Sequence, residues 1–303
     1  MVIVIVGPTG IGKTKLSIEL AKKINGEIIN ADSTQVYKGL DIATAKVTEQ
    51  EKKGIIHHLF DIKNVEEDYS VYDYQKDARK KIDDILKKGK TPILVGGTGL
   101  YIKACLYNYC FNKTVNNKTY DEYTNDMLYE MLLKIDSSTS IHKNNRKRII
   151  RALNYYEDTN KNISENKTNE LIYDSIFIGL TTSRNVLYER INKRVDIMVN
   201  NGLLQEAKKI YDSNIRTKAI LTPIGYKELF PYFEGIKSLD ECLEEIKKAS
   251  RKYAKRQDTW NRHQFDVNWI DVDFENFDKI VLEAYKIVMG GNKWILKIKW
   301  KNY

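Results

Sequence analysis

The chain opens on an unbroken apolar, β-branched run, Val2 to Val6, which ends at Gly7. Such a run predicts a strand that is buried on both faces, as in a parallel sheet. From Lys15 to Asn25 the apolar positions recur at helical spacing instead. A buried strand that passes through a glycine-rich turn into a helix predicts the first unit of an α/β fold.

The same two patterns alternate through most of the chain. Further strands are expected at residues 27–32, 92–95, 174–180 and 267–270. Further helices are expected at residues 70–88, 127–135, 146–156, 184–200, 202–212, 225–232 and 239–261. Strands that alternate with helices in this way predict a parallel sheet flanked by helices.

The glycine-rich turn carries the pattern G-x-x-x-x-G-K-[ST] of a P-loop. Its members are Gly7, Pro8, Thr9, Gly10, Ile11, Gly12, Lys13 and Thr14. In such a loop the backbone N–H groups and the helix start hold a polyphosphate, the lysine adds a charge, and the threonine hydroxyl can ligate Mg²⁺. The turn lies between a strand and a helix, as this mechanism requires. We therefore expect a P-loop NTPase-like α/β fold that binds a diphosphate or nucleotide, with Mg²⁺ at Thr14.

One stretch interrupts the alternation. Between Phe111 and Glu170, polar clusters rich in Asn, Lys and Thr flank two short amphipathic segments. This predicts a small helical insertion domain at 111–170 within a catalytic core formed by 1–110 and 171–290. A basic tail, 291–303, follows paired glycines, and its pattern fits an edge strand, a membrane-surface segment or a disordered end.

Two further loops follow predicted strands at the same sheet edge as the P-loop. The strand at 27–32 ends in Asp32, and the residues after it lack a clean period, as in an ordered substrate loop or an ordinary surface loop. The strand at 92–95 ends in the glycine-rich segment from Gly96 to Tyr101. A hydrolytic P-loop protein normally holds Mg²⁺ through a carboxylate at such a position, so energy-coupled ATP hydrolysis is disfavoured.

Charge adds candidate partners. The chain has 50 Lys and Arg against 41 Asp and Glu, a net charge of +9, which favours polyanions. Basic residues cluster at 143–151 and at 247–262, and both clusters contain arginine, which suits bidentate phosphate contacts and hence RNA. The alternative for each cluster is a solvated surface rich in lysine.

Other signals are weaker. Cys105, Cys110 and Cys242 have no metal-ligand spacing, so we expect reduced packing residues. His57 and His58 have no carboxylate or cysteine at ligand spacing close by, which disfavours a metal site. No apolar run is long enough to span a membrane. These features favour a cytoplasmic protein without a membrane partner, and no obligate protein partner is evident.

Taken in order, the motifs resemble the tRNA dimethylallyltransferase family. They are GPTGIGKT, ADSTQVYKGLDIATAK, HHLFD, LVGGTGLY, RKRIIRAL, INKRVDIMVNNGLLQEA, IGYKEL and KRQDTW. The resemblance runs from about Val2 to Trp269 and is specific because DS-x-Q-x-Y occurs together with GGTGLY. It implies transfer of a dimethylallyl group from dimethylallyl diphosphate to N6 of the adenosine 3′ of the anticodon in tRNA.

The resemblance also implies roles for individual residues. Asp32 would accept the N6 proton, and Thr98 would hydrogen-bond near the diphosphate or the reacting centre. Lys13 and Thr14 with Mg²⁺ would stabilise the leaving diphosphate, with Arg184 and Arg194 as further candidates. The implied tRNA contacts are Asp32, Ser33, Thr34, Gln35, Thr98, Lys147, Arg148, Arg151, Gly225, Tyr226, Lys227, Lys255, Arg256, Gln257, Trp260 and Arg262.

Two other classes remain open at this point. A P-loop kinase for a small molecule would share the phosphate-binding loop, although an arginine-rich lid is not apparent. A non-catalytic RNA-binding P-loop protein would share the basic clusters, but it has no evident need for Asp32 beside the P-loop.

Overall fold

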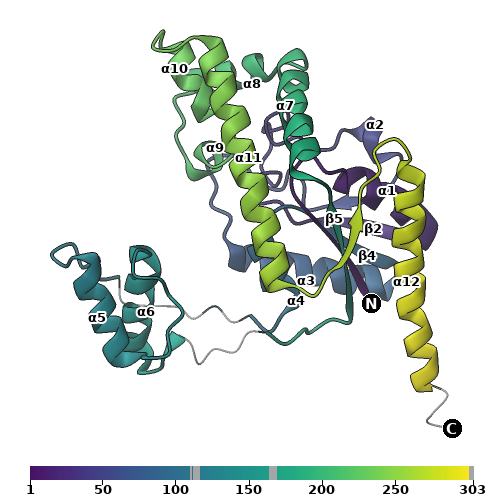
Figure 1. Ribbon diagram of the computed structural model, residues 1–303, viewed down its shortest axis with the longest axis horizontal. Coiled ribbons are helices and arrows are strands. Elements are labelled where there is room, and N and C mark those ends of the chain that lie inside the picture. The colour runs from purple at the N-terminus through teal and green to yellow at the C-terminus, as the bar shows by residue number, and fades with distance from the viewer. Residues whose placement is uncertain (110, 112–116, 164–168, 300–303) are drawn as a thin grey trace. The chain divides into compact units, whose positions relative to one another are not determined.

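The computed structural model describes residues 1–109, 111, 117–163 and 169–299, with side chains through residue 290. The chain divides into two compact units. We call Met1–Leu106 with Tyr173–Tyr303 the core unit, and Tyr107–Ile172 the insertion unit (Figure 1). The sequence predicted the insertion at 111–170.

A six-stranded parallel sheet, in the order β3-β2-β4-β1-β5-β6, forms the centre of the core unit. The strands are β1 (Val2–Val6), β2 (Gly26–Asn30), β3 (His57–His58), β4 (Thr91–Val95), β5 (Ser175–Thr181) and β6 (Asn268–Asp271). In the central register Ile5 pairs with Val95 on one side and Ile178 on the other. All side chains of β1 are buried, as its apolar run predicted. The α/β fold class is thereby confirmed.

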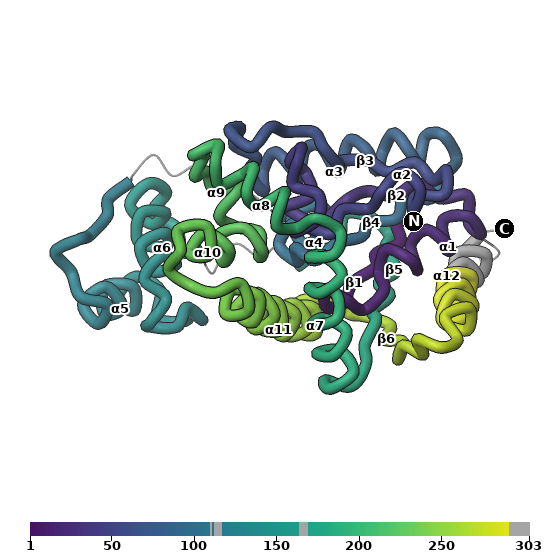
Figure 2. Tube along the Cα trace, turned by 90° about the horizontal axis from the view of Figure 1, so that it is seen from above, coloured from purple at the N-terminus to yellow at the C-terminus, as the bar shows by residue number. Residues whose placement is uncertain are grey.

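Helices cover both faces of this sheet (Figures 1 and 2). They are α1 (Lys13–Ile24), α2 (Glu49–Lys52), α3 (Val71–Lys87), α4 (Gly99–Leu106), α7 (Arg184–Asn200), α8 (Leu203–Asp212), α9 (Lys218–Leu221), α10 (Phe230–Phe233), α11 (Leu239–Gln264) and α12 (Phe277–Lys299), with a 3₁₀ turn, η2 (Lys227–Leu229). α1 packs beside α12, and α3 packs beside α4. The long helix α11 runs along α7 and also reaches α4 and η2.

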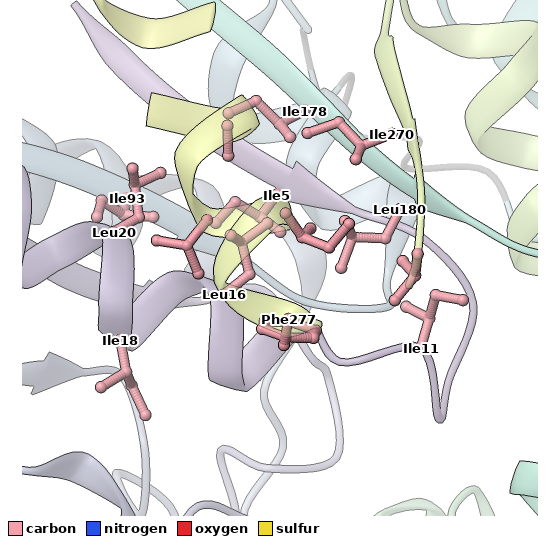
Figure 3. Close-up of a cluster of buried hydrophobic side chains, with 14 of the residues drawn as sticks. Ile5, Ile11, Leu16, Ile18, Leu20, Ile93, Ile178, Leu180, Ile270 and Phe277 are labelled. Carbon is pink, nitrogen blue, oxygen red and sulfur yellow. The ribbon is translucent and has the colours of Figure 1, made fainter. Parts of the chain in front are cut away.

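The main hydrophobic cluster lies between one sheet face and the pair α1 and α12. Ile5 and Ile178 of the sheet meet Leu16 and Leu20 of α1 there (Figure 3). α12 contributes the buried residues Phe277, Ile280, Val281, Ala284 and Val288. The P-loop connects β1 to α1, and both of these elements are packed into this cluster. The two ends of the P-loop are therefore fixed.

α12 is the largest element that the sequence reading missed. The paired glycines at 290 and 291 were expected to end the preceding structure, yet the helix continues to Lys299. The prediction of an edge strand is therefore wrong for the described part of the tail, which is helical. Burial of the earlier turns of α12 against the sheet outweighs the helix cost of about 1 kcal/mol per glycine. Residues 300–303 lie outside the described residues.

The segment predicted as a helix at 225–232 was also misread. It forms the short η2 and α10, and an unpredicted helix, α9, precedes it. Gly225 has a φ of +123°, which favours glycine and interrupts a helix. A Cβ on Gly225 would lie 3.0 Å from the Ala43 Cβ, so this backbone approaches a distant loop closely.

The insertion unit is a helical pair, α5 (Asn125–Ile135) and α6 (Arg146–Thr159). Thr124 and Asn145 cap the two helices through side-chain oxygens that accept backbone N–H bonds. The buried residues between the helices are Leu128, Leu132, Ile149, Ala152 and Leu153. The chain enters and leaves this unit at an antiparallel bridge between Tyr107 and Leu171.

Two of the cysteines are buried free thiols. Cys105 lies in α4 and Cys242 in α11. Burial raises the pKa of the Cys105 thiol to about 12, which fits a packing role. Cys110 lies outside the described residues. Among the helices that are described, none combines the length and apolar character needed to cross a membrane.

Candidate active site

The P-loop owes its shape to glycine. Gly7 and Gly12 have φ values of +138° and +107°, which other residues rarely adopt. A Cβ on Gly7 would come 2.7 Å from the Leu180 carbonyl oxygen. α1 begins at Lys13, directly after Gly12, so its unpaired N–H groups lie at the loop. This arrangement can hold a polyphosphate, as the sequence predicted.

The start of α12 supports the outer side of the P-loop. Phe277 packs against Gly12, where a Cβ would lie 3.0 Å from the ring. Lys15 Nζ lies 4.5 Å from the centroid of the same ring. Figure 3 shows Phe277 next to Leu16 of α1. This support was not predicted because α12 was not predicted.

Two cations converge on the P-loop. Lys13 Nζ donates hydrogen bonds to the carbonyl oxygens of Gly7 and Pro8, both at 2.9 Å. Arg194 of α7 lies beside the loop, with Nη1 at 3.5 Å from Thr9 Oγ1. Burial and then the nearby Arg194 charge lower the pKa of Lys13 to about 7. An anion bound here would therefore meet two cations that repel each other in its absence.

Asp32 follows β2 in a fixed orientation. Its backbone N–H donates to Asn30 Oδ1 at 2.9 Å, and Asn30 Nδ2 donates to the Asp32 carbonyl at 3.0 Å. Asp32 Oδ1 accepts hydrogen bonds from Thr34, from N at 3.0 Å and from Oγ1 at 2.7 Å. Asp32 Oδ2 lies 3.4 Å from where a Cβ on Gly97 would be. One carboxylate oxygen thus fixes the turn, and the other faces the loop after β4.

The loop after β4 is joined to the Asp32 segment. Thr98 Oγ1 accepts from Ser33 N at 3.0 Å and donates to Ser33 Oγ at 3.2 Å. Thr98 N donates to the Ala31 carbonyl at 3.0 Å. A Cβ on Gly96 would come 2.1 Å from the Ala31 carbonyl carbon, so no side chain fits at this position. The glycines of GGTGLY therefore bring Thr98 next to Asp32.

α11 borders the site together with the P-loop and the loop after β4. Gln257 Oε1 accepts from Thr9 N at 2.8 Å, and Gln257 Nε2 donates to the Gly97 carbonyl at 3.1 Å. Gln257 is 5% exposed, and a Cβ on Gly97 would lie 2.1 Å from its amide nitrogen. Its side chain therefore joins the P-loop to the β4 loop. This is a different use of Gln257 from the tRNA contact that the sequence resemblance implied.

Two aromatic residues of α11 flank Gln257. Tyr253, one turn earlier, lies beside Thr98 and Gln257, and burial raises the pKa of its hydroxyl. Trp260 lies against Gly99, where a Cβ would be 2.1 Å from the indole Cδ1. The sequence indicated Tyr253 only as a candidate for stacking beside the basic cluster, although its spacing of four residues from Gln257 places both on one helix face.

α7 presents its arginines unequally. The predicted Arg184 is exposed at the start of the helix. Arg190, which was not predicted, donates from Nε to the Gly10 carbonyl at 3.2 Å and lies 3.7 Å from the Phe274 ring centroid. Together with Arg194, it places α7 along the P-loop.

A shallow, open groove of about 470 Å³ is lined by residues of α11. Its lining residues are Lys255, Arg256, Thr259, Trp260, His263 and Gln264. Lys255 and Arg256 are exposed, as a phosphate-contacting role requires. Arg262 is not part of this lining. It donates to Asp258 Oδ1 at 3.0 Å and lies 4.3 Å from the Trp269 ring.

The residues of the IGYKEL motif separate in the structure. Tyr226 is fully buried, and its hydroxyl donates to Glu206 Oε1 at 2.7 Å. Burial and the Glu206 carboxylate raise the pKa of Tyr226 well above its usual range. Gly225 is buried as well, whereas Lys227 is exposed and donates to the Leu221 carbonyl at 3.0 Å. The buried Tyr226 ring gives this tyrosine an internal role in place of a direct RNA contact.

In the insertion unit, the basic residues Lys147, Arg148 and Arg151 are exposed on α6. Arg146 differs from them because it is tied inside the unit. Its guanidinium donates to the Tyr123 carbonyl at 2.7 Å and to the Tyr120 carbonyl at 2.5 Å. The exposed three are available to a polyanion.

The histidine pair lies in β3. His58 Nε2 is 2.7 Å from Glu27 Oε2, and Lys90 Nζ donates to Glu27 Oε1 at 2.8 Å. His57 Nδ1 lies 2.8 Å from the Ile55 carbonyl oxygen. The fold thus brings to His58 a carboxylate that is distant in sequence, within an ion-pair cluster centred on the buried Glu27.

Comparison with known proteins agrees with these motifs. Residues 35–264 match the model of a family described as IPP transferase. A tRNA dimethylallyltransferase of Anoxybacillus flavithermus is 48% identical over 299 residues, 95% of this chain and 96% of that protein. One of Bacillus subtilis is 46% identical over 284 residues, 89% of this chain and 90% of that protein.

Solved structures show the same likeness. The full-length tRNA isopentenylpyrophosphate transferase of Bacillus halodurans is 42% identical, with a TM-score of 0.77 and coverage of 98% of each chain. A eukaryotic dimethylallyltransferase acting on tRNA is 34% identical, with a TM-score of 0.81, over 91% of this chain and 75% of that one.

Proposed function

The chain belongs to the IPP transferase family, and we propose that it transfers a dimethylallyl group from dimethylallyl diphosphate to N6 of the adenosine 3′-adjacent to the anticodon of tRNA. The observation that carries this proposal is the joining of Asp32 to the P-loop. Gln257 bonds to Thr9 on one side and to Gly97 on the other, and Gly97 faces Asp32 Oδ2. The proposed proton acceptor and the proposed diphosphate site are therefore connected through Gln257 and Gly97.

In the proposed reaction the C–O bond to the diphosphate breaks and the N6–C bond forms. The bonding electron pair leaves with the diphosphate, where Lys13, Arg194 and the loop N–H groups stabilise the added charge. The N6 proton passes to Asp32 Oδ2, because Oδ1 is held by Thr34. Thr98, fixed by Ser33, would orient the reacting groups.

Thr14 fits the role of a Mg²⁺ ligand. It is exposed in the first turn of α1, directly after Lys13, where a bound diphosphate would lie. Bound Mg²⁺ would neutralise charge on the diphosphate. The Thr14 hydroxyl would be one ligand of that ion.

The tRNA anticodon stem-loop would meet the exposed basic residues. Arg148 and Arg151 of the insertion unit suit contacts to the phosphate backbone, as do Lys255 and Arg256 of α11. Trp260, which lines the α11 groove, offers a ring for stacking. Such contacts would offset the few kcal/mol needed to draw a base out of the stack. We place this reaction in the cytoplasm.

The test is to incubate the protein with Mg²⁺, unmodified tRNA and dimethylallyl diphosphate labelled in the dimethylallyl group. We expect label in the RNA and release of diphosphate, with loss of transfer when Mg²⁺ is chelated. A parallel reaction with ATP labelled in the γ-phosphate tests the kinase alternative. If label from ATP enters a small molecule and no label from the dimethylallyl donor enters RNA, the proposal is wrong and the kinase alternative is favoured.

The role of the insertion unit has its own test, the joint change Arg148→Ala and Arg151→Ala. The plot of log affinity for tRNA against log salt should flatten by about one unit per lost phosphate contact. The control is Lys76→Ala with Lys80→Ala, which removes two exposed charges of the same sign from α3. Equal effects of the two double variants would show that Arg148 and Arg151 contribute only general surface charge and no specific phosphate contact.

A further inference from the structure

Residues 33–46, which we call the 33–46 loop, follow Asp32 without a helix or strand. The first half of the loop pairs with residues 61–63, where the Val36 carbonyl accepts from Ile62 N and Lys63 N, and the outer turn is held by α8. Glu206 of α8 accepts hydrogen bonds from three consecutive backbone N–H groups of this loop. The donors are Asp41 N at 3.1 Å, Ile42 N at 2.9 Å and Ala43 N at 3.1 Å. Hydrogen bonds to an ionised carboxylate are about twice as strong as neutral ones. One side chain of the core unit thus fixes the outer turn of the loop.

The anchored turn is connected to the start of the loop. Gln35 Nε2 donates to the Thr44 carbonyl at 2.8 Å and to the Ala45 carbonyl at 3.4 Å. Gln35 follows Thr34, whose N–H and hydroxyl hold Asp32 Oδ1. A continuous series of hydrogen bonds and short chain segments therefore runs from Glu206 through the turn to the carboxylate.

Glu206 itself is held in place. The hydroxyl of the buried Tyr226 donates to Glu206 Oε1 at 2.7 Å. The Tyr226 ring packs in a hydrophobic cluster with Val36 and Leu40 of the loop and Leu203 of α8. The tyrosine of IGYKEL thus fixes the rotamer of the carboxylate that anchors the loop.

We propose that Glu206 is a positioning residue for the transfer reaction: it holds the 33–46 loop so that Asp32 and Gln35 have the geometry the reaction needs. This inference rests on the proposed function. Among the described contacts, none joins Glu206 to the P-loop. The P-loop is held by its own segment, by α7 and by α11. Loss of Glu206 should therefore affect transfer and leave diphosphate binding intact.

The test compares Glu206→Gln and Glu206→Ala with Asp212→Asn. The control also neutralises a carboxylate of α8, but at an exposed site where Asp212 accepts from Lys208, one turn earlier on the same helix. We expect kcat for transfer to fall by about tenfold to a hundredfold in both Glu206 variants, the scale of a displaced reacting group. The dissociation constant for inorganic pyrophosphate should change by less than about twofold. Tyr226→Phe, which removes one of the bonds to Glu206, should give an intermediate loss.

Hydrogen exchange of the backbone amides is the second measurement, and it does not depend on activity. Exchange at Asp41, Ile42 and Ala43 should speed up in the Glu206 variants, while exchange in β1 stays unchanged. Transfer within twofold of Asp212→Asn would overturn the proposal, as would parallel losses of pyrophosphate binding and of β1 protection. If the wild-type protein transfers no dimethylallyl group, the proposed function fails, and the amide exchange still reports whether Glu206 holds the loop.

Discussion

The P-loop and the 33–46 loop lie at the C-terminal ends of two strands of one sheet, yet their backbone conformations depend on different features. The P-loop is shaped from within, since Gly7 and Gly12 supply the positive φ values and Lys13 bonds back to Gly7. The 33–46 loop has internal bonds from Gln35 and Lys46, but it lacks such glycine-dependent turns at its anchored part and relies on distant side chains as well. Its turn depends on Glu206, more than 160 residues away in sequence, and its start depends on Thr98.

The difference teaches where each loop is vulnerable. A segment held by its own backbone geometry is disrupted mainly by changes inside it, and its motif is visible in the sequence. A segment held by distant side chains can be displaced by a mutation in another helix, even where that helix does not line the phosphate site. The phosphate site and the proton acceptor can therefore be perturbed separately, and the predictions below use this separation.

The largest effect is expected for Asp32→Asn. The variant keeps an oxygen for the two bonds from Thr34 and so preserves the turn, but it removes the proposed base. Transfer in a single turnover should fall by about a hundredfold to ten-thousandfold, the range for positioned acid–base groups. Affinity for tRNA and for pyrophosphate should remain.

The alternative for Asp32 is a purely structural role in the turn. It predicts a lower melting temperature for Asp32→Ala and nearly normal transfer for Asp32→Asn. A folded Asp32→Asn protein that binds tRNA and transfers within tenfold of the wild-type rate would exclude the base.

Lys13→Ala should have the next largest effect. It removes the charge that we propose stabilises the leaving diphosphate, and loss of one preorganised electrostatic donor costs about a hundredfold or more in turnover. Unlike Asp32→Asn, it should also weaken pyrophosphate binding, which calorimetry can measure. Near-normal turnover in folded Lys13→Ala would contradict the assignment of the P-loop to the diphosphate.

The sequence predicted elements whose patterns are local. The strands from Val2 to Val6 and at 92–95, the P-loop and the Ser70-capped helix could be read because a few adjacent residues specify each. α12 carries an equally clear helical spacing, with Ile280, Ala284 and Val288 on its buried side, and could have been predicted. The glycine pair drew attention to a break that tertiary packing overrides.

The site was predicted in its parts and not in its connections. Gln257 was placed on the correct helix, but sequence gives no sign that its amide bonds to Thr9 and Gly97, 248 and 160 residues away. The buried hydroxyl of Tyr226 and its partner Glu206 are hidden for the same reason. Such pairings depend on how α8 and α11 pack, which a local pattern does not contain.

The third prediction concerns pH and the P-loop alone. The pKa of Lys13 is about 7 in the free protein, and a bound diphosphate must raise it by favouring the charged form. Below pH 7 the lysine is already charged. Above pH 7 binding takes up a proton, so pyrophosphate affinity should fall by up to about tenfold per pH unit until the pKa of the complex is reached.

Lys13→Arg is the matched control for this pH dependence, since arginine stays charged throughout. Pyrophosphate titrates identically with both proteins, so the difference between their slopes reports Lys13. Equal slopes for the wild type and Lys13→Arg between pH 7 and about 8.5 at about 25 °C would show that Lys13 does not change its protonation on binding.

The smallest effect is expected for Lys46→Met, which weakens the 33–46 loop at its end. Lys46 Nζ donates to the Tyr37 carbonyl at 2.7 Å and to Asp41 and Asp61, each at 2.6 Å. The two carboxylates are largely exposed and can return to water, so their pairing contributes little. The carbonyl of the buried Tyr37 loses a donor, which costs about 1–3 kcal/mol if it stays unpaired.

We therefore expect Lys46→Met to lower the melting temperature by a few degrees and transfer by less than about tenfold, because Glu206 still anchors the turn. Lys38→Met is the control, since Lys38 lies in the same loop with an exposed side chain. Pyrophosphate affinity should be unchanged in both variants. Equal loss of transfer in the two would mean that the charge of the loop matters and its anchoring at Lys46 does not, whereas a loss confined to Lys46→Met would show that the hydrogen bonds of Lys46 support this loop in addition to Glu206.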